Sequence, residues 1–304
     1  MKALVLLNMG AARSKDELEV FLTNMFNDKN ILTIKNDTLR SMIASLIVNL
    51  RLNKAWENYE EIGGKSPLHD ITDQLVKKLQ KELPDYFVTV AMRYTSPFAQ
   101  TAIARIEEKN IQDVTLLPLY PQYSTTTTKS SVEDFIEKAQ DRFTIKTVEP
   151  FYKNELYNKA ICDEIIKTKA KWEDFHLIFS AHGLPQKVIN KGDPYQTQIE
   201  EHVEILTETL SHYATNFHSI NLAYQSKVGP MKWLTPSLET MLENFKGKKV
   251  LIYPISFIID NSETVFELDI EYREIAKKIG IQDYRVCRCI NDSDIFVDTI
   301  KEII

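Results

Sequence analysis

The sequence predicts an α/β fold in which parallel sheets are covered by helices on both faces. Short, continuous apolar runs such as Ala3–Asn8 and Val114–Leu119 are typical of strands that are buried on both sides. Amphipathic patterns at helical spacing separate these runs along the whole 304-residue chain. Strands that alternate with helices indicate parallel sheets, because two adjacent parallel strands need a crossover connection.

The same alternation defines every element that we expect, in chain order. The predicted strands are Ala3–Asn8, Phe87–Arg93, Val114–Leu119, Phe143–Val148, Leu177–Ala181, Ser219–Tyr224, Val250–Ile255 and Tyr284–Cys287. The predicted helices are Asp16–Phe26, Thr38–Asn53, Leu68–Glu82, Phe98–Lys109, Val132–Arg142, Leu156–Lys169, Tyr195–Tyr213, Pro236–Asn244, Glu263–Lys278 and Asp294–Ile303.

A faint internal similarity suggests two halves. Asp113–Pro118 and Lys249–Pro254 are both predicted strands that end in proline, and each is followed by a loop and a helix that opens with Ser and Glu. Two similar α/β halves with a cleft between them explain this similarity. Chance resemblance between two strand–helix units explains it equally well.

The chain length suggests about two domains. We place the boundary near Glu149–Pro150, which gives an N-terminal domain of residues 1–149 and a C-terminal domain of residues 150–290. We expect the C-terminal helix, within residues 291–304, to pack on the first domain.

Composition excludes several classes of protein. The net charge of −6 argues against a general nucleic-acid binder. Eight glycines, where average usage gives about 21, leave no Gly-rich phosphate loop and no dinucleotide or Walker pattern. No apolar run reaches membrane-spanning length, and the N-terminal run is too short for a signal peptide. We therefore expect a cytoplasmic protein.

The cysteine count points in the same direction. Cys162, Cys287 and Cys289 are the three cysteines, so a disulfide framework is not expected and a reducing compartment fits. Three thiols also cannot supply the usual four ligands of an iron–sulfur cluster or a structural zinc. We expect no permanently bound cofactor.

The stretch Phe175–Pro185 contains the first candidate for chemistry. Its apolar run predicts a buried strand, and Gly183 and Pro185 end that strand. His182 therefore lies at the carboxyl end of a strand, where open parallel sheets bind ligands. Imidazole suits proton transfer and metal binding near neutral pH. A histidine that only hydrogen-bonds a loop is the alternative.

A second candidate follows the strand Val114–Leu119. The loop Leu119–Ser124 carries two phenols and an amide, and it runs into four threonines. Aromatic and hydroxyl groups together suit a large, flat ligand with polar edges. A proline-turned loop that caps the next helix with Ser or Thr is the simpler interpretation. A similar polar loop, Ala223–Pro230, ends a strand in the second half.

The helix that begins near Glu263 is acidic along one side. Glu263, Glu267, Glu271 and Glu274 recur at three- and four-residue spacing and so share a face of an α-helix. A solvated acidic face is the ordinary explanation, and Asp260 with Glu263 fits a capping box. The alternative is a path for a cation that ends at Glu263. His182 and Glu263 together then form a base and metal-ligand pair.

At this level of detail the chain resembles the ferrochelatases, enzymes of haem biosynthesis. The matching motifs cover nearly the whole chain. They are Leu7–Gly10, Ile62–Leu68, Met92–Tyr94, Leu117–Thr128, Ser180–Pro185, Gly192–Tyr195, Tyr224–Pro230 and Glu263–Asp269.

The resemblance implies a function and a fold. It implies two similar Rossmann-like domains, each a parallel sheet flanked by helices, with a porphyrin cleft between them. It also implies insertion of Fe²⁺ into protoporphyrin IX to give protohaem, the terminal step of haem biosynthesis, without an iron–sulfur cluster. A chelatase for another tetrapyrrole or metal (coproporphyrin, or cobalt with sirohydrochlorin) and a non-catalytic porphyrin- or haem-binding protein are the alternatives.

The resemblance also assigns roles to residues. It implies that His182 and Glu263 are the catalytic and metal-contacting pair. The spacing of the acidic series separately suggests Glu267 and Glu271 as an entry path for the metal. The resemblance places Met9, Arg93 and Tyr123 at the porphyrin site, and the composition of the loop Leu119–Ser124 adds Tyr120, Gln122 and Ser124 as expected substrate-binding residues. Met9 resembles the methionine of the protoporphyrin-using branch of the family, whereas the coproporphyrin-using branch tends to carry tyrosine.

The sequence departs from the family pattern in three places. Asn261 replaces a histidine and can only hydrogen-bond, which puts proton relay on that side in doubt. Ala11-Ala12 replaces Gly-Pro, and Glu61 stands where some relatives carry arginine.

The segment 38–54 has apolar residues on one face and basic residues elsewhere. Core or lid packing explains most of this pattern, and we expect at most weak peripheral membrane contact. We further expect a monomer that binds protoporphyrin and ferrous iron, and no nucleic acid.

Overall fold

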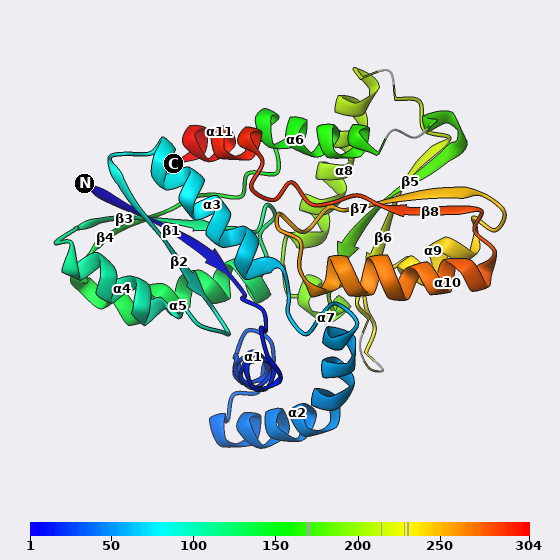
Figure 1. Cartoon of the computed structure of the whole chain (residues 1–304). Helices are drawn as coiled ribbons and strands as arrows, with labels where there is room; N and C mark the ends of the chain where they lie inside the picture. The colour runs from blue at the N-terminus through cyan, green and yellow to red at the C-terminus, as the bar shows by residue number, and fades with distance from the viewer. Residues whose placement is uncertain (169–170, 214, 228, 230) are drawn as a thin grey trace. The chain divides into compact units, whose positions relative to one another are not determined.

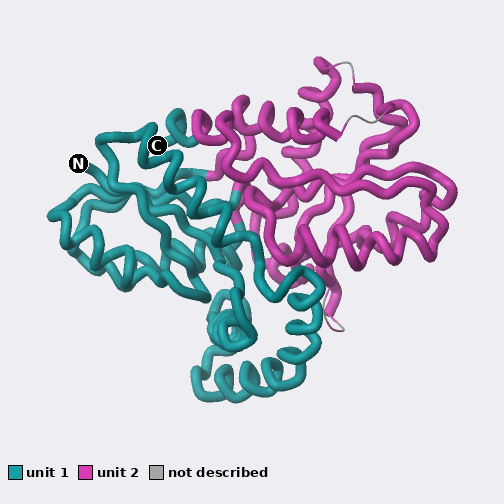
Figure 2. Tube along the Cα trace, in the orientation of Figure 1, with its two compact units in different colours: residues 1–120, 124–149, 300–304 teal, residues 121–123, 150–299 magenta. Residues whose placement is uncertain are grey.

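The structure, a computed structural model, describes residues 1–168, 171–213, 215–227, 229 and 231–304. The chain divides into two compact units, each with its own sheet (Figures 1 and 2). Unit 1 comprises residues 1–120, 124–149 and 300–304, and unit 2 comprises residues 121–123 and 150–299.

Unit 1 is built on a parallel four-stranded sheet with the strand order β2-β1-β3-β4. Its strands are β1 (Lys2–Asn8), β2 (Tyr86–Met92), β3 (Asp113–Pro118) and β4 (Thr144–Thr147). Its helices are α1 (Lys15–Asn27), α2 (Asp37–Glu60), α3 (Leu68–Glu82), α4 (Ala99–Glu108), the π-helix η1 (Thr125–Lys129), α5 (Ser130–Ala139) and the 3₁₀ turn η2 (Gln140–Arg142).

The core of unit 1 lies where helices cover the sheet. Alternate residues of β1, Ala3, Val5 and Leu7, pack with the apolar faces of α4 and α5. Figure 1 shows α4 and α5 together on one side of the sheet and α3 on the other. Both faces are therefore covered, which explains why β1 reads as a continuous apolar run.

Unit 2 repeats this arrangement with the strand order β6-β5-β7-β8, again all parallel. Its strands are β5 (Phe175–His182), β6 (Ser219–Gln225), β7 (Lys249–Pro254) and β8 (Asp283–Val286). Its helices are α6 (Glu155–Lys167), the 3₁₀ turn η3 (Trp172–Asp174), α7 (Gln186–Ile189), α8 (Tyr195–Ser211), α9 (Leu238–Glu243), the π-helix η4 (Glu263–Glu271) and α10 (Tyr272–Ile279).

The predicted fold class is confirmed: each unit is a parallel four-stranded sheet flanked by helices. The two proline-terminated strands of the internal similarity, β3 and β7, occupy equivalent positions in the two strand orders. Each also precedes a π-helix, η1 in unit 1 and η4 in unit 2. The similarity therefore reflects two similar halves and not chance.

The elements differ from the prediction mainly at helices. Helix α2 continues to Glu60 instead of ending near Asn53, and α7 was not predicted. The predicted α-helix Glu263–Lys278 is π-helical over Glu263–Glu271 and α-helical only after that. Lys169, the predicted end of one helix, lies outside the described residues.

The C-terminal helix α11 (Asp294–Ile303) belongs to both units. Its last residues, from Ile300 onward, group with unit 1, and residues up to Thr299 group with unit 2. Lys301 forms an ion pair with Glu82 of α3. No helix within the described residues combines the length and the apolar character needed to cross a membrane.

Candidate active site

His182 is the last residue of β5, at the carboxyl edge of the unit 2 sheet. Its backbone is held on both sides: the amide donates to Ser256 Oγ at 2.9 Å, and the carbonyl accepts from the Tyr195 hydroxyl at 2.9 Å. The imidazole lies edge-on to the ring of Phe257, with the ring centroids 6.3 Å apart. The ring is thus fixed in place while its side chain stays 37% exposed.

The glycine after His182 is required by a close backbone approach. Gly183 N donates to Gln225 O at 2.9 Å. A Cβ at position 183 would lie 2.6 Å from that same carbonyl oxygen, well inside van der Waals contact. Glycine is therefore required directly after His182, where the end of β5 lies beside Gln225, the last residue of β6.

Glu263 opens η4, and its position is set by the loop before it. Glu263 N donates to Asn261 Oδ1 at 2.8 Å. The suggested capping box, with Asp260 as the cap, is not formed. Asp260 Oδ1 instead accepts from Cys289 N at 3.1 Å and Thr264 Oγ1 at 3.2 Å. Asn261, the residue that replaces a family histidine, therefore has a structural role in holding Glu263.

The two side chains meet directly. His182 Nδ1 lies 2.8 Å from Glu263 Oε2. Burial tends to lower the pKa of His182, but the Glu263 carboxylate outweighs it and raises that pKa above its ordinary value. Burial tends to raise the pKa of Glu263, but the charge and hydrogen bond of His182 lower it below its ordinary value. Near neutral pH the pair favours an imidazolium–carboxylate form.

Glu267 lies beside this pair. Ser226 Oγ is 2.6 Å from Glu267 Oε2 and 3.3 Å from Glu263 Oε2, so one hydroxyl lies between two carboxylates. Gln225 Nε2 also donates to Glu267 at 3.3 Å, and Ser180 orients that amide. Burial and the charge of Glu263 raise the pKa of Glu267 to about 7. Glu267 can therefore exchange a proton near neutral pH.

The rest of the acidic series is different. Glu271 ends η4 and Glu274 lies in α10, and both are exposed. The α-helical face on which the prediction relied is not present over Glu263–Glu271, because a π-helix closes its hydrogen bonds over five residues. What the structure brings together with His182 is Glu263 and Glu267.

The predicted substrate-binding residues of unit 1 lie at the carboxyl ends of three adjacent strands. Met9 follows β1, Arg93 follows β2 and Tyr120 follows β3. Arg93 N donates to Asn8 O at 2.8 Å, which joins the first two strand ends. The Tyr120 hydroxyl lies 3.0 Å from Ser131 Oγ. All three side chains are partly exposed.

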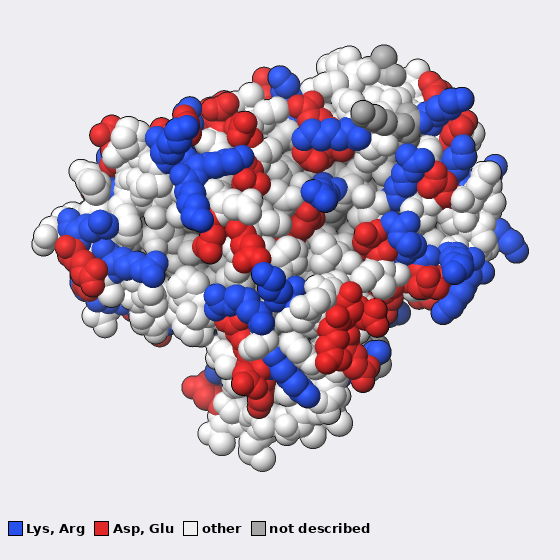
Figure 3. Space-filling view, in the orientation of Figure 1, with Lys and Arg blue, Asp and Glu red and all other residues white. Residues whose placement is uncertain are grey.

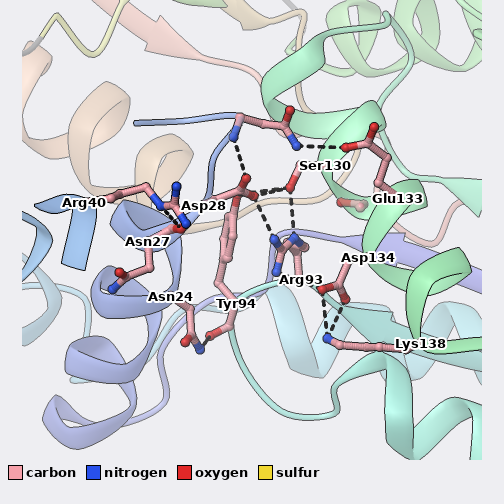
Figure 4. A network of polar contacts seen from close by, with 12 residues as sticks. Asn24, Asn27, Asp28, Arg40, Arg93, Tyr94, Ser130, Glu133, Asp134 and Lys138 are labelled. Atoms are coloured by element: carbon pink, nitrogen blue, oxygen red, sulfur yellow. Dashed lines mark hydrogen bonds and ion pairs between the residues drawn. The ribbon is translucent and has the colours of Figure 1, made fainter. Parts of the chain in front are cut away.

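Arg93 is the centre of a polar network in unit 1 (Figure 4). Its guanidinium forms ion pairs with Asp28 and Asp134, each at 3.0 Å, and its Nε donates to Ser130 at 2.9 Å. Asp28 is fully buried and also accepts from the Tyr94 hydroxyl at 2.8 Å. Two carboxylates thus offset the charge of Arg93, and only 20% of its side chain is exposed.

The remaining predicted binding residues form part of the loop after β3. Gln122 and Ser124 are buried. Gln122 Nε2 lies 2.8 Å from His202 Nδ1, and Ser124 caps η1. Tyr123 is partly exposed, and its backbone N–H donates to Gln198 at 2.7 Å.

Three residues that hydrogen-bond the pair or its surroundings, Ser226, Ser256 and His202, were not predicted from the sequence. Ser226 lies within a quoted motif, and its φ of +65° marks it as unusual, but backbone angles cannot be read from sequence. Ser256 and His202 carried no sequence signal at all. Of the motif Tyr224–Pro230, Val228 and Pro230 lie outside the described residues.

Comparison with known proteins decides the family. The family model described as Ferrochelatase matches residues 1–304. A protein named ferrochelatase from a Nitratiruptor species is 54% identical, with 100% of this chain and 99% of that protein covered. Those from Sulfurimonas denitrificans and Wolinella succinogenes are 52% and 49% identical, with at least 98% of each chain covered.

The chain belongs to the ferrochelatase family. It is therefore an enzyme of the metal-chelatase type, a lyase.

Solved structures support the fold of this ferrochelatase-family chain. SirB from Bacillus subtilis, solved with Fe³⁺, has a TM-score of 0.58 at 12% identity and covers 100% of this chain and 96% of SirB. CbiX, described as the terminal enzyme for sirohaem biosynthesis in denitrifying bacteria, has a TM-score of 0.55 at 10% identity, with 100% of both chains covered. At these identities the likeness concerns the fold alone.

The pair makes a first prediction for this ferrochelatase-family chain. Because the charge of Glu263 raises the pKa of His182, Glu263→Gln lowers the midpoint at which His182 titrates. Glu267→Gln lowers it less, since Glu267 makes a smaller contribution. NMR of the imidazole C–H signals against pH measures both shifts.

The control is Glu274→Gln, which removes an exposed carboxylate of α10 and leaves the His182 midpoint unchanged. A His182 midpoint that does not move in Glu263→Gln would show that the two side chains are not paired in solution.

Proposed function

We propose that the chain inserts Fe²⁺ into protoporphyrin IX to give protohaem, the terminal step of haem biosynthesis. The observation that carries the proposal is the contact between His182 Nδ1 and Glu263 Oε2, 2.8 Å long, at the carboxyl edge of a parallel sheet in a ferrochelatase-family chain. Protoporphyrin and iron are both substrates in this reaction.

The chemistry requires a base and a metal ligand close together. A free-base porphyrin carries two pyrrole N–H groups that point into the hole the metal must occupy. Bending the ring exposes nitrogen lone pairs, and binding energy from the rest of the macrocycle can support that strain. Because Nδ1 of His182 is used in the contact with Glu263, Nε2 is the ring nitrogen that would meet a pyrrole proton or the metal.

The electrostatics of the pair suggest how metal arrival and proton removal are coupled. Glu263 raises the pKa of His182, so the resting imidazole tends to hold a proton that it must lose before it can act as a base. A cation that binds Glu263 offsets the carboxylate charge and thereby lowers the pKa of His182. Metal binding in this way releases the imidazolium proton to solvent and leaves a neutral imidazole that accepts one pyrrole proton. The second pyrrole proton passes to solvent after His182 has lost the first.

Glu267 offers the next site for a proton or a cation. It shares Ser226 with Glu263, and its pKa of about 7 lets it take up or release a proton during turnover. We assign the metal path to Glu267 first and to the exposed Glu271 second. Carboxylate and imidazole ligands also suit Zn²⁺, which is a practical probe for Fe²⁺.

Protoporphyrin is favoured over other macrocycles by two residues. Met9, at the end of β1, resembles the methionine of the protoporphyrin-using branch. Arg93, the arginine assigned to the substrate site, is already neutralised by Asp28 and Asp134. A substrate with eight carboxylates, such as sirohydrochlorin, calls for arginines that are free of such partners.

The reaction needs no resident cofactor in this proposal. The three cysteines are buried, and burial raises the pKa of Cys162 to about 12 and also raises the pKa values of Cys287 and Cys289. Protonated thiols are poor metal ligands. Iron found in the purified protein at a fixed ratio, with a cluster absorption band, would contradict this assignment.

Helix α2 is the place for contact with a membrane surface, which we propose as weak and peripheral for a cytoplasmic monomer. Leu39, Met42, Leu46 and Leu50 are 49–74% exposed and recur on one helical face. The lowest part of the surface in Figure 3, where Figure 1 places α2, is largely uncharged. Vesicle binding that is unchanged by Leu46→Ser with Leu50→Ser would exclude this contact.

The insertion reaction is tested by absorbance. Purified protein consumes free-base protoporphyrin with Fe²⁺ or Zn²⁺, and His182→Ala slows this by roughly 10²–10⁴-fold, the usual contribution of a positioned general base. The control is His176→Ala, which removes a buried histidine from the start of β5 and keeps activity in proportion to folded protein.

The same assay separates the alternatives. We expect a higher kcat/KM for protoporphyrin than for coproporphyrin, and the reverse order would favour the coproporphyrin alternative. Tight porphyrin binding without insertion of any metal would favour a binding protein. Undiminished insertion by His182→Ala would remove His182 from the mechanism.

The metal path predicts a graded response along the acidic residues. Glu267→Gln raises the apparent KM for Zn²⁺ by roughly tenfold, because it removes a half-buried charge beside Glu263, while the porphyrin Kd stays within about twofold. Glu271→Gln, at an exposed position, has a smaller effect on the Zn²⁺ KM, and Glu274→Gln has none. If Glu267→Gln changed the Zn²⁺ KM and the porphyrin Kd equally, the acidic residues would form only a solvated face and not a metal path.

A further inference from the structure

The segment Pro121–Tyr123 is hydrogen-bonded to helix α8 by two side chains on one helical face. Gln198 and His202 are four residues apart and therefore neighbours on that face. Gln198 Oε1 accepts from Tyr123 N at 2.7 Å, and His202 Nδ1 lies 2.8 Å from Gln122 Nε2. The segment groups with unit 2, whereas the chain immediately before and after it groups with unit 1.

The direction of these hydrogen bonds is fixed by two carbonyl groups that can only accept. Gln122 Nε2 lies 3.4 Å from Ile255 O, so the same NH₂ group donates to Ile255 and to His202 Nδ1. At the other end, Asn158 Nδ2 donates to Tyr152 O at 3.0 Å. Asn158 Oδ1 must therefore accept from His202 Nε2, 2.8 Å away. Only a neutral imidazole with its proton on Nε2 satisfies both neighbours.

The hydrogen bonds of this network form a closed ring, and the side chains in it are buried from solvent. Pro121 O accepts from Phe151 N and Tyr152 N, each at 3.2 Å, which returns the chain of bonds to the residue next to Gln122. Gln122, Asn158 and His202 are each at most 2% exposed. A hydrogen bond lost here cannot be replaced by solvent, so each member constrains the others.

Aromatic packing holds the imidazole in the plane that the bonds require. The ring of Tyr157 stacks on His202 with centroids 5.8 Å apart and an interplanar angle of 26°, and Tyr152 meets it edge-on at 5.9 Å. Burial lowers the pKa of His202 to about 3, in keeping with the neutral ring that the hydrogen bonds demand.

The network also includes Ile255, whose neighbour Ser256 hydrogen-bonds the backbone of His182. Ile255, whose carbonyl accepts from Gln122, donates its own N–H to Ser180 O at 3.0 Å. The next residue, Ser256, accepts from His182 N at 2.9 Å. Gln122 thus hydrogen-bonds the loop that also fixes the backbone of the proposed base.

We propose that His202 is a positioning residue for the reaction: as a neutral, Nε2-protonated imidazole it orients Gln122 and holds the Pro121–Tyr123 segment in the form that binds the macrocycle. The proposal rests on the proposed function in assigning Tyr123 to the porphyrin site. Gln122 is then a support of that site, and its buried amide does not contact the substrate.

The first test is spectroscopic and independent of activity. In ¹⁵N NMR at pH 7, with the His202 signal assigned by its loss in His202→Phe, the ring is neutral and protonated on Nε2. Gln122→Met shifts the Nδ1 resonance, because it removes the donor to that nitrogen. A ring protonated on Nδ1, or on both nitrogens, could not accept a hydrogen bond from Gln122 Nε2 and would overturn the proposal.

The second test measures porphyrin affinity without metal, by quenching of protein fluorescence. His202→Phe keeps the aromatic packing but leaves Gln122 without its acceptor, and it weakens porphyrin binding by about tenfold, the equivalent of one buried hydrogen bond. Gln122→Met removes the same bond from the loop side and weakens porphyrin binding similarly. The double variant is no weaker than either single variant, because both act through one interaction.

The matched control is His176→Phe, another buried histidine of unit 2, at the amino end of β5. It leaves the porphyrin Kd and the Zn²⁺ KM within about twofold of wild type. The proposal fails if this control loses as much porphyrin affinity as His202→Phe, or if the losses of the two singles add in the double variant. A wild-type protein that binds porphyrin but inserts no metal would refute the proposed function and leave this test intact.

Discussion

The hydrogen bond between His182 Nδ1 and Glu263 Oε2 is the interaction on which the site depends. It requires His182, the last residue of β5, to be held in a fixed position. The hydrogen bonds of its backbone to Ser256 and Tyr195 hold it there. It also requires η4 to start at Glu263, which Asn261 ensures by accepting from the Glu263 N–H. The same bond raises the pKa of His182 and lowers that of Glu263, so geometry and proton affinity have one origin.

Both units place their candidate site residues by one rule of parallel sheets. Strand ends that point the same way bring residues distant in sequence to a common edge, as Met9 and Arg93 in unit 1 and His182 and Gln225 in unit 2 illustrate. The candidate site residues therefore lie at strand ends, in the loops that follow them and, for Glu263 and Glu267, on the helix η4. In each unit the third strand of the sheet order, β3 or β7, is followed along the chain by a π-helix. The two halves therefore share more than their strand order.

The sequence predicted the parts of this arrangement that depend on local pattern. Buried parallel strands are continuous apolar runs, so β1 and β5 could be placed within two residues, and with them the strand-end position of His182. The π-helical form of Glu263–Glu271 could not be foreseen, because its residues also satisfy α-helical spacing. Ser226 and His202 act through contacts with residues more than 35 positions away, and no local pattern encodes such contacts.

The most direct test of the account is to locate a cation at the pair. A crystal soaked in Zn²⁺, with anomalous differences measured at the zinc edge, is expected to show a peak about 2.0–2.2 Å from a Glu263 oxygen and from a ring nitrogen of His182. The peak should disappear in Glu263→Gln, whose amide is a weaker ligand. Zinc bound elsewhere in the chain, with His182 and Glu263 still hydrogen-bonded to each other and free of metal, would contradict the account.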